Sequence, residues 1–554
     1  MISYMAPLLT ESIHSFLYRK LVGSSSNEEA EPYPKLAPTL LSGLAFLCLA
    51  AYCALGAVAI TAAGAKLLPN QTDNTYPETT NIYAAINAAR TGRLYAEPSR
   101  PPYVLQPFGP LYYAINAALA RASHLDFDLT RARGRLLTYG CFLLCAAIIF
   151  VICRRLRFPT LSSTLAALLF LGQPYFLTWN VTVRPDILAL LMMLLSLLWA
   201  VEGDSLGGAG YVFSGILAGL AFLIKQPGIA APVAIIAILI YRRRFRAAAI
   251  FALSIGFPVV LVFAPLLWHG GPFLEQFASV GKGVWSLQQG VIFAFDKLSR
   301  LLLLVPIGIG AIGFVQAIRV ATPASQMIAA FAVTNWVVGF SGLPQLGADT
   351  NYFLGGLTGC ALLLPFAVQL VRRNLQSTVY FVLIISALLW VISQEVIIVS
   401  RVFSDAFRPA ERSYLSLERF KIFSDRPIYT VHGRDPDVLD PFTSHELELA
   451  GYWDPSLIIA NIRRGDYDLV ILADNGNWHV VSNYRGVAFF SPAVVTALNE
   501  NYRILCSTAT SAVLQPLARE VAITPADLAP ALGKPCDLNL HGHSPGLRVP
   551  PYAR

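Results

Sequence analysis

The residues of this chain that could do chemistry are a few charged side chains beside long apolar segments. Glu78, Arg184, Asp186, Lys225 and Asp349 fall in this group within the first 400 positions. A charge near a membrane core is costly, so each is a candidate functional residue. Carboxylates can accept a proton from a reacting hydroxyl, and cations can stabilise charge that develops on an anionic group. The set predicts a site that works on something reached from one face of a membrane.

Composition indicates an integral membrane protein. Of 554 residues, 55% are hydrophobic and only 13% are charged, and the mean hydropathy is +0.56. A soluble domain has about 25% charged residues. The formal net charge is +8, but the arginines form short runs at the ends of apolar segments, as the positive-inside rule expects. No Lys/Arg-rich tract is interleaved with aromatic residues, so nucleic-acid binding is set aside.

Eleven apolar segments are candidate spans, because a spanning helix needs about 20 mostly apolar residues. They are 40–62, 136–152, 161–177, 185–201, 211–224, 229–241, 247–267, 301–318, 327–343, 353–371 and 379–399. The fifth and sixth are short and are joined by Lys225-Gln226-Pro227, so they could form a hairpin that does not reach the full bilayer thickness. We expect an all-α polytopic membrane domain of about eleven transmembrane helices at 39–400, preceded by a cytoplasmic tail at 1–38.

Basic loops predict the orientation. Arginines follow the second, sixth, eighth and tenth spans, and all of these ends lie on one side: Arg154, Arg155, Arg157, Arg242, Arg243, Arg244, Arg246, Arg319, Arg372 and Arg373. That side is expected to be cytoplasmic, although the short loop at 202–204 lacks basic residues. The long loop at 66–135 then lies outside, together with everything after about residue 401.

The region 401–554 has a different character, since charges, Pro and His return. The segments Ile428–Val431 and Asp468–Leu472 are typical of short strands, and we expect a small extracytoplasmic α/β domain. Cys506 and Cys536 are its two cysteines. An oxidising compartment would permit a disulfide, although two cysteines alone do not establish one.

Polar residues gather at the predicted outer face. The first outer loop contains a predicted helix at 81–90 and an apolar segment at 111–122, which is too short to span and is expected to lie in the interface. Later spans and the loops beside them place further polar residues at the same face. These are Arg184, Asp186, Lys225, Asp349, Asn351, Tyr352 and Glu395. The middle of the bilayer is almost free of charge, whereas a proton-coupled carrier would more often place ionisable groups there.

The order of several motifs resembles the GT-C membrane glycosyltransferases, which include the dolichyl-phosphate-mannose–protein mannosyltransferases and the bacterial aminoarabinose transferases. The motifs are Glu78 soon after the first span, Gly92…Leu94-Tyr95, Pro101-Pro102-Tyr103, Phe108-Gly109-Pro110-Leu111-Tyr112-Tyr113, Arg184-Pro185-Asp186, Gly219-Leu220-Ala221-Phe222-Leu223-Ile224-Lys225-Gln226 and Asn351-Tyr352-Phe353. The resemblance covers roughly residues 40–400. It implies transfer of a sugar from a polyprenyl-phosphate donor to a lipid, glycan or protein acceptor outside the membrane, with inversion at the sugar carbon.

The resemblance also implies roles for residues. Glu78 would be the general base with Asp73 as the second choice, Lys225 and Arg184 would bind the donor phosphate, and the substrate would contact Asp186, Asp349, Asn351, Tyr352 and Tyr112. A convincing acidic pair just after the first span is lacking, so no cofactor or metal ligand is expected and a divalent metal is in doubt. The implied location is a bacterial inner (plasma) membrane with a periplasmic active site.

Each role has a structural alternative. Glu78 could favour the dipole of the following helix, Lys225 could be a lysine that extends toward the interface, and Asp349 and Asn351 could form a turn. Asp126-Phe127-Asp128 has the form of a metal-binding motif, but a capping role is favoured. Two other classes of function stay open: a membrane transporter, and a non-catalytic membrane scaffold with an outer binding domain.

Overall fold

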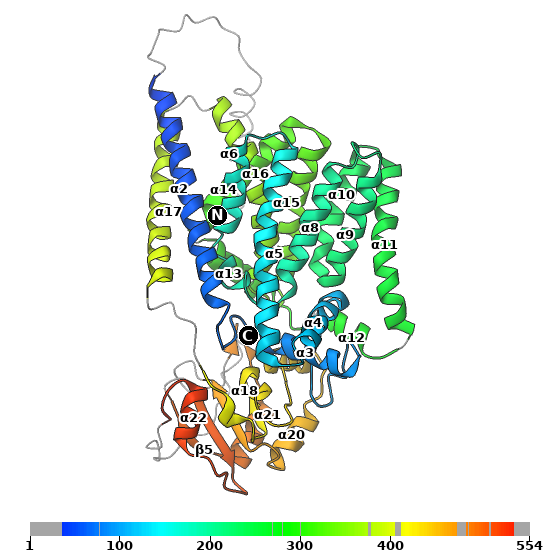
Figure 1. Cartoon of the computed structure of the whole chain (residues 1–554), viewed down its shortest axis with the longest axis vertical. Helices are drawn as coiled ribbons and strands as arrows, with labels where there is room; N and C mark the ends of the chain where they lie inside the picture. Colours follow the sequence, from blue (N-terminus) through cyan, green and yellow to red (C-terminus); the bar gives the residue numbers. More distant parts are fainter. Residues whose placement is uncertain are drawn as a thin grey trace, which may run out of the picture.

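The computed structural model describes residues 36–536, except for 77, 269, 280, 300, 375–377, 405–411, 474–482, 486 and 509–510. A bundle of long helices forms one part of the molecule, and a smaller α/β domain lies against one end of it (Figure 1). Nearly all of the predicted cytoplasmic tail at 1–38 lies outside the described residues.

All eleven predicted spans coincide with helices. In chain order these are α2 (Leu36–Leu67), α5 (Phe127–Arg155), α6 (Thr160–Leu171), α8 (Pro185–Val201), α9 (Ala209–Ile224), α10 (Ala230–Tyr241), α11 (Phe245–Trp268), α14 (Leu301–Val320), α15 (Pro323–Gly342), α16 (Leu354–Asn374) and α17 (Thr378–Phe403). The third predicted span is too long, because its helix ends at Leu171 and a separate short helix, α7 (Phe176–Trp179), follows. Among the described residues, five helices are long and apolar enough to cross a membrane, and shorter apolar helices accompany them.

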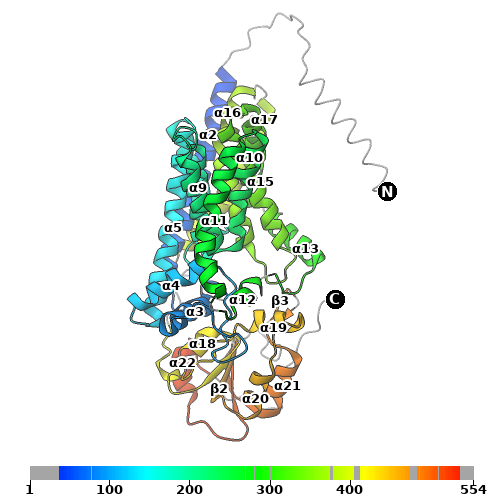
Figure 2. The same cartoon turned by 90° about the vertical axis from the view of Figure 1, so that its right-hand side faces the viewer.

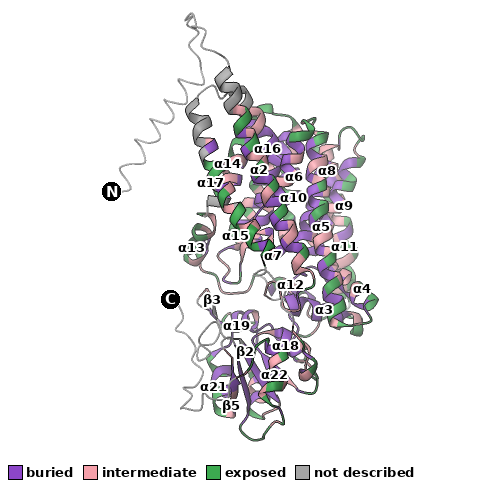
Figure 3. Ribbon diagram, turned by 60° about the vertical axis from the view of Figure 1, so that its left-hand side comes forward, coloured by how far each residue is buried: buried purple, intermediate pink, exposed green. Residues whose placement is uncertain are grey.

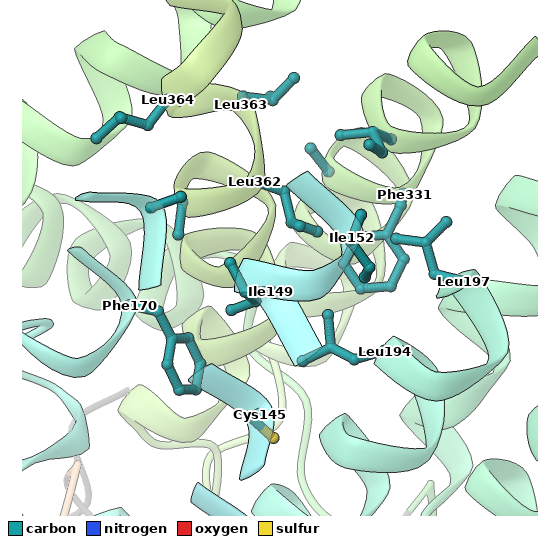
Figure 4. Close-up of a cluster of buried hydrophobic side chains, with 14 of the residues drawn as sticks. Cys145, Ile149, Ile152, Phe170, Leu194, Leu197, Phe331, Leu362, Leu363 and Leu364 are labelled. Atoms are coloured by element: carbon teal, nitrogen blue, oxygen red, sulfur yellow. The ribbon is translucent and has the colours of Figure 1, made fainter. Parts of the chain in front are cut away.

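The bundle packs around an apolar core to which α5 contributes Cys145, Ile149 and Ile152 (Figure 4). These side chains contact Phe170 of α6 and residues of α8 and α16 in one cluster. Figure 3 shows many exposed residues on the outer surface of the bundle. They include apolar residues, such as Leu253 of α11, which is 76% exposed. An apolar exterior of this kind suits a lipid environment.

The bundle end nearest the α/β domain carries short helices. They are α3 (Glu78–Thr91), α4 (Pro110–Ala122), α12 (Phe273–Ser279), α13 (Leu287–Leu298) and two 3₁₀ turns, η2 (Gln226–Ile229) and η3 (Thr350–Phe353). The helix predicted at 81–90 is therefore confirmed as α3, and the apolar segment at 111–122 forms most of α4. Helix α4 packs against α3, α5 and α9, and its Tyr112 and Tyr113 are buried.

The α/β domain is built on a four-stranded sheet of order β1-β2-β6-β5. Its strands are β1 (Ile422–Ser424), β2 (Leu469–Ala473), β5 (Tyr502–Ser507) and β6 (Ser511–Pro516), and only β1 and β2 are parallel. Its remaining elements are η4 (Leu415–Leu417), α18 (Pro427–Val431), α19 (Pro441–Leu449), α20 (Ser456–Arg463), β3 (Asn483–Tyr484), β4 (Val487–Ala488), α21 (Pro492–Asn501) and α22 (Pro525–Leu532).

Two expectations for this domain have opposite outcomes. The strand predicted at Asp468–Leu472 is confirmed as β2, but the strand predicted at Ile428–Val431 is wrong, since these residues belong to helix α18. Pro427 stands at the first helical position, where its fixed φ and missing N–H favour a helix start. Cys506 and Cys536 form a disulfide, which links β5 to the segment after α22.

The far end of the bundle holds the arginine-rich loops. The acidic loop at 202–204, which did not fit the charge pattern, lies beside them. Glu202 pairs with Arg155 at 3.7 Å, and Asp204 pairs with Arg244. The loop therefore adds acidic partners at the same end as the basic residues.

Candidate active site

A cavity of about 410 Å³ lies where the bundle meets the α/β domain. Its wall includes Arg184 and Lys225 from the bundle, Tyr76 from the first long loop, Asn351 from η3, and Glu446 from α19 of the α/β domain. The sequence separation of these residues is large, so only the fold brings them together. The cavity has about the size of pockets that hold small-molecule ligands.

Lys225 reaches the cavity because helix α9 ends just before it. Its backbone is extended, with φ −153° and ψ 135°, and Pro227 follows in η2. The Lys225 Nζ donates to Asp186 Oδ1 at 2.5 Å, and the Asn351 Nδ2 donates to the same oxygen at 2.8 Å. The ammonium also lies 5.4 Å from the centre of the Tyr352 ring.

Arg184 forms an ion pair with the other oxygen of the Asp186 carboxylate. It directly precedes Pro185, the first residue of α8, and its Nε lies 3.5 Å from Asp186 Oδ2. The guanidinium stacks over the rings of Trp179 and Phe108, at 4.9 and 5.5 Å from their centres. One carboxylate thus faces two cations, which leaves a net positive charge at this part of the cavity wall and favours an anionic ligand.

Close backbone packing fixes the turn between α9 and η2, which carries Lys225. The Gly109 amide donates to the Ile224 carbonyl at 3.1 Å, and a Cβ at Gly109 would lie only 2.0 Å from the Leu223 carbonyl oxygen. Gln226 Nε2 donates to the carbonyls of Pro107 and Phe277. The sequence motif that begins at Phe108 therefore contacts the α9–η2 turn directly, and this contact requires glycine at position 109.

Glu78, the predicted base, lies outside the cavity wall. Its Oε1 accepts from Arg135 Nε and the Val183 amide, and its Oε2 accepts from Arg135 Nη2 and the Asn74 amide, all within 2.6–2.9 Å. Both oxygens are therefore engaged within the protein. This geometry favours a structural role, in which Glu78 joins the first loop to α5 and to the segment before α8.

Asp73, the second choice, is held by Thr79, whose hydroxyl donates to Asp73 Oδ1 at 2.5 Å. Burial, with the nearby charge of Glu78, raises the pKa of Asp73 to about 6. Asp73 is also outside the cavity wall. Asp126, by contrast, caps α5 by accepting from the Leu129 amide at 2.7 Å, as favoured from sequence.

The predicted substrate-binding residues divide into two groups. Asp349, Asn351 and Tyr352 line the cavity, and Asp349 also caps η3 by accepting from the Thr350 amide. Tyr112 and Asp186 lie outside the cavity wall. The Tyr112 hydroxyl donates to the Val183 carbonyl at 2.9 Å in the protein interior, and Asp186 pairs with Arg184 and Lys225. The sequence could not separate these groups, because an aromatic residue beside a span is common in either setting.

Sequence reasoning missed the contribution of the α/β domain. Asp440, the N-cap of α19, accepts from the Tyr76 hydroxyl at 2.5 Å, and Glu446 of the same helix lines the cavity. Burial raises the pKa of the Asp440 carboxyl, while the Tyr76 hydrogen bond acts in the opposite direction. Within the described part of the chain, no cluster of three or more His, Cys, Asp or Glu residues could hold a metal ion.

Known proteins resemble this chain in one segment of sequence and in overall fold. Residues 117–269 match the family PMT_2, described as Dolichyl-phosphate-mannose-protein mannosyltransferase. No curated protein matches the chain at a significant level. ArnT from Cupriavidus metallidurans in the apo state is similar in structure, with a TM-score of 0.54 and 13% identity, over 83% of this chain and 96% of ArnT. The structure of the same ArnT bound to undecaprenyl phosphate is also similar, with a TM-score of 0.54 and 12% identity. This match covers 85% of this chain and 98% of ArnT.

The family model matches residues 117–269 of this chain, and the fold as a whole is similar to that of ArnT. The resemblance predicted from sequence is thereby confirmed. The structural likeness to ArnT, at 12–13% identity, establishes the shared fold alone.

Proposed function

We propose that this chain transfers a sugar from a polyprenyl-phosphate donor to an acceptor hydroxyl, with the donor phosphate bound by Arg184 and Lys225. The observation that carries the proposal is the pair of cations that share Asp186 at the cavity wall. They are fixed by the protein before any ligand arrives, so little reorganisation is needed when an anion binds.

The chemistry of such a donor matches this charge arrangement. The donor is a phosphodiester with one negative charge, and breaking its sugar–oxygen bond produces a phosphate monoester with a second charge. Cations that contact the phosphate therefore stabilise the transition state more than the ground state, which is the requirement for catalysis. ArnT has been crystallised with undecaprenyl phosphate, which supports a polyprenyl phosphate as the ligand to test here.

Position in the fold supports a lipid-linked donor as well. Lys225 ends an apolar helix of the bundle, and Arg184 begins another. A ligand with its phosphate at these residues can keep its hydrocarbon chain beside the apolar bundle. We propose Asp349, Asn351 and Tyr352 as neighbours of the sugar, since they line the same cavity. The acceptor is a lipid, glycan or protein, and a displacement that inverts the sugar carbon is the expected reaction.

Binding of undecaprenyl phosphate to purified protein in nanodiscs tests the phosphate site. Lys225→Met and Arg184→Gln should each weaken binding by roughly 10–100-fold, the loss expected for one charge-assisted hydrogen bond. Undecaprenol, which lacks the phosphate, should bind weakly and equally to all variants. Lys297→Met is the matched control, because Lys297 pairs with Asp296 on α13 and is not part of the cavity wall.

Turnover is tested with a panel of polyprenyl-phosphate-linked sugars. Sugar transfer or donor hydrolysis by the wild type, reduced in both cation variants but not in Lys297→Met, is the expected result. Wild-type protein that neither binds undecaprenyl phosphate nor turns over any donor would exclude the proposed function.

A further inference from the structure

A carboxylate of the α/β domain lies in the cavity without a hydrogen-bond partner on one oxygen. Glu446 is on α19, which lies on the side of the α/β domain that faces the bundle (Figure 2). Glu446 is only 2% exposed, and among the described residues its Oε1 has no hydrogen-bond partner. A buried polar atom without a partner is costly, so its position in a cavity wall suggests a partner supplied by a ligand.

Two glycines lie close to this carboxylate and leave room for it because they have no side chain. A Cβ at Gly347 would lie 2.9 Å from Glu446 Oε2, and a Cβ at Gly283 would lie 3.2 Å from Oε1. The carboxylate is therefore held between two backbone segments of the bundle. Because these segments approach so closely, they fix its position and leave its polar edge toward the cavity, whose wall also contains both glycines.

The environment suits a proton acceptor. Burial raises the pKa of Glu446 to about 8, and the nearby charge of Asp440 acts in the same direction. The positive charge of Arg485 and the backbone of Gly347 and Val284 act in the opposite direction. A base is most effective when its pKa lies near the working pH.

Other carboxylates are less available for this role. Asp440 accepts from the Tyr76 hydroxyl and from Thr443, and Asp349 caps η3. Glu78 is engaged by Arg135 on both oxygens and lies outside the cavity wall. Of the cavity carboxylates, Glu446 combines burial, an oxygen without a partner and a fixed position.

We propose that Glu446 is the general base that accepts the proton of the acceptor hydroxyl, an inference that rests on the proposed glycosyl transfer. The acceptor oxygen forms a bond to the sugar carbon and gives its proton to Glu446. The bond between that carbon and the phosphate oxygen breaks, and its electron pair leaves with polyprenyl phosphate. Glu446 then releases the proton to solvent, so the α/β domain completes the active site.

The residues that act on the leaving group and those that act on the nucleophile thus belong to two different parts of the chain. Arg184 and Lys225, in the bundle, hold the leaving group, whereas Glu446, in the α/β domain, activates the nucleophile. In an inverting displacement the nucleophile attacks the face of the sugar opposite the leaving group. A cavity with cations on the bundle side and a carboxylate on the domain side provides for this arrangement.

Glu446→Gln is the direct test. Glutamine has the shape of the protonated glutamic acid, and it removes a carboxyl whose ionisation is opposed by burial, so this variant should fold at least as well as wild type. Transfer should fall by about 10²–10⁴-fold, while undecaprenyl phosphate binding stays within about twofold of wild type. Glu448→Gln is the matched control, because it lies on the same helix but is not part of the cavity wall.

The pH profile separates a base from a purely structural residue. In wild type, kcat/KM should rise with pH and level off above about pH 8, and this limb should disappear in Glu446→Gln. Glu446→Asp should keep the limb at a reduced rate, because it retains a carboxylate at a less favourable distance. A Glu446→Gln variant with wild-type turnover, or with the same rising limb, would overturn the proposal. Wild type without donor binding or turnover would instead remove the proposed function and this inference with it.

Discussion

The carboxylate of Glu78 and the guanidinium of Arg135 form a doubly hydrogen-bonded ion pair in which both side chains are completely excluded from solvent. The guanidinium also donates to the carbonyls of Asn70 and Thr72. The pair therefore ties the chain that leaves α2 to the first turns of α5. A buried pair of this kind is costly to break, because the remaining partner is left as an uncompensated buried charge.

We expect Glu78→Ala to destabilise the protein by about 3–5 kcal/mol, the usual cost of removing one member of a buried ion pair. Glu78→Gln should cost less, since the amide keeps one acceptor oxygen. Thermal unfolding in detergent measures both effects. Turnover per folded molecule should change far less in Glu78→Gln than in Glu446→Gln.

An exposed arginine pair of the α/β domain provides the control. Arg503 pairs with Glu520, whose side chains are 47% and 89% exposed respectively, and such surface pairs contribute little to stability. Glu520→Gln should leave the unfolding temperature nearly unchanged. If Glu78→Gln unfolds like wild type but loses the rising pH limb of turnover, Glu78 acts as the base and the structural role is wrong.

The pH dependence of stability should report on Asp73. Its pKa is raised from 3.8 to about 6 in the folded protein, so the folded state binds the proton more tightly than the unfolded state. Its favourable contribution is present below about pH 4 and is lost as the pH rises through 6. Asp73→Asn should therefore raise the unfolding temperature by a few degrees at pH 7.5, with little difference from wild type near pH 4.

Asp435→Asn provides the comparison for this effect, because the side chain of Asp435 is 84% exposed. Its difference from wild type should not vary with pH between 4 and 7.5. A pH-independent difference for Asp73→Asn as well would show that the folded carboxyl has an ordinary pKa.

Hydropathy was sufficient to locate the helices of the bundle, because each one presents a long apolar surface. The range predicted for α8 agrees with its observed bounds, since Pro185 marks the start of an uninterrupted apolar run. Hydropathy was insufficient for Ile428–Val431, because a short, mainly apolar segment of this kind fits a helix or a strand equally well. Pro427 decides the outcome, by favouring the first turn of a helix.

Part of the site could also be predicted from sequence. Arg184, Asp186 and Lys225 were identifiable because a charge at the end of an apolar helix is unusual. Glu446 was not, because carboxylates are common in a polar domain and the contact between α19 and the bundle depends on the tertiary fold. The same limit applies to Arg135, whose partner Glu78 lies 57 positions earlier in the chain.

The contact between Gly109 and the α9–η2 turn should be sensitive to a single methyl group. A Cβ at this position would lie 2.0 Å from the Leu223 carbonyl oxygen, so the backbone must move in Gly109→Ala. We expect a loss of a few kcal/mol in stability, the scale of an overpacked interior site, and weaker undecaprenyl phosphate binding, because Lys225 is carried on the displaced turn. Gly140→Ala is the control, since nothing lies within 4 Å of its added Cβ. Wild-type behaviour of both variants would mean that the turn is not held by this contact.

Arg485 should hold the loop between α15 and η3 in place for the α/β domain. Its Nη1 donates to the carbonyls of Leu343, Gln345 and Ala348 at 3.1–3.4 Å, and the guanidinium lies over the Phe293 ring. Several carbonyls converge on one planar cation, an arrangement that a lysine cannot reproduce. Because this loop leads directly into η3, whose residues line the cavity, its position affects the site without any contact between Arg485 and substrate.

Arg485→Ala should therefore speed amide exchange in residues 343–349 and lower kcat/KM by about 10-fold, the effect of losing roughly 1.4 kcal/mol of positioning. Arg485→Lys should restore little of the lost kcat/KM, because lysine supplies a charge but not the planar guanidinium that contacts several carbonyls at once. Arg503→Ala is the matched control, because Arg503 pairs with Glu520 at the surface of the same domain. Hydrogen exchange followed by mass spectrometry measures the loop directly. Unchanged exchange in Arg485→Ala would mean that the bundle alone orders this loop, and that the α/β domain contributes Glu446 without shaping the rest of the cavity.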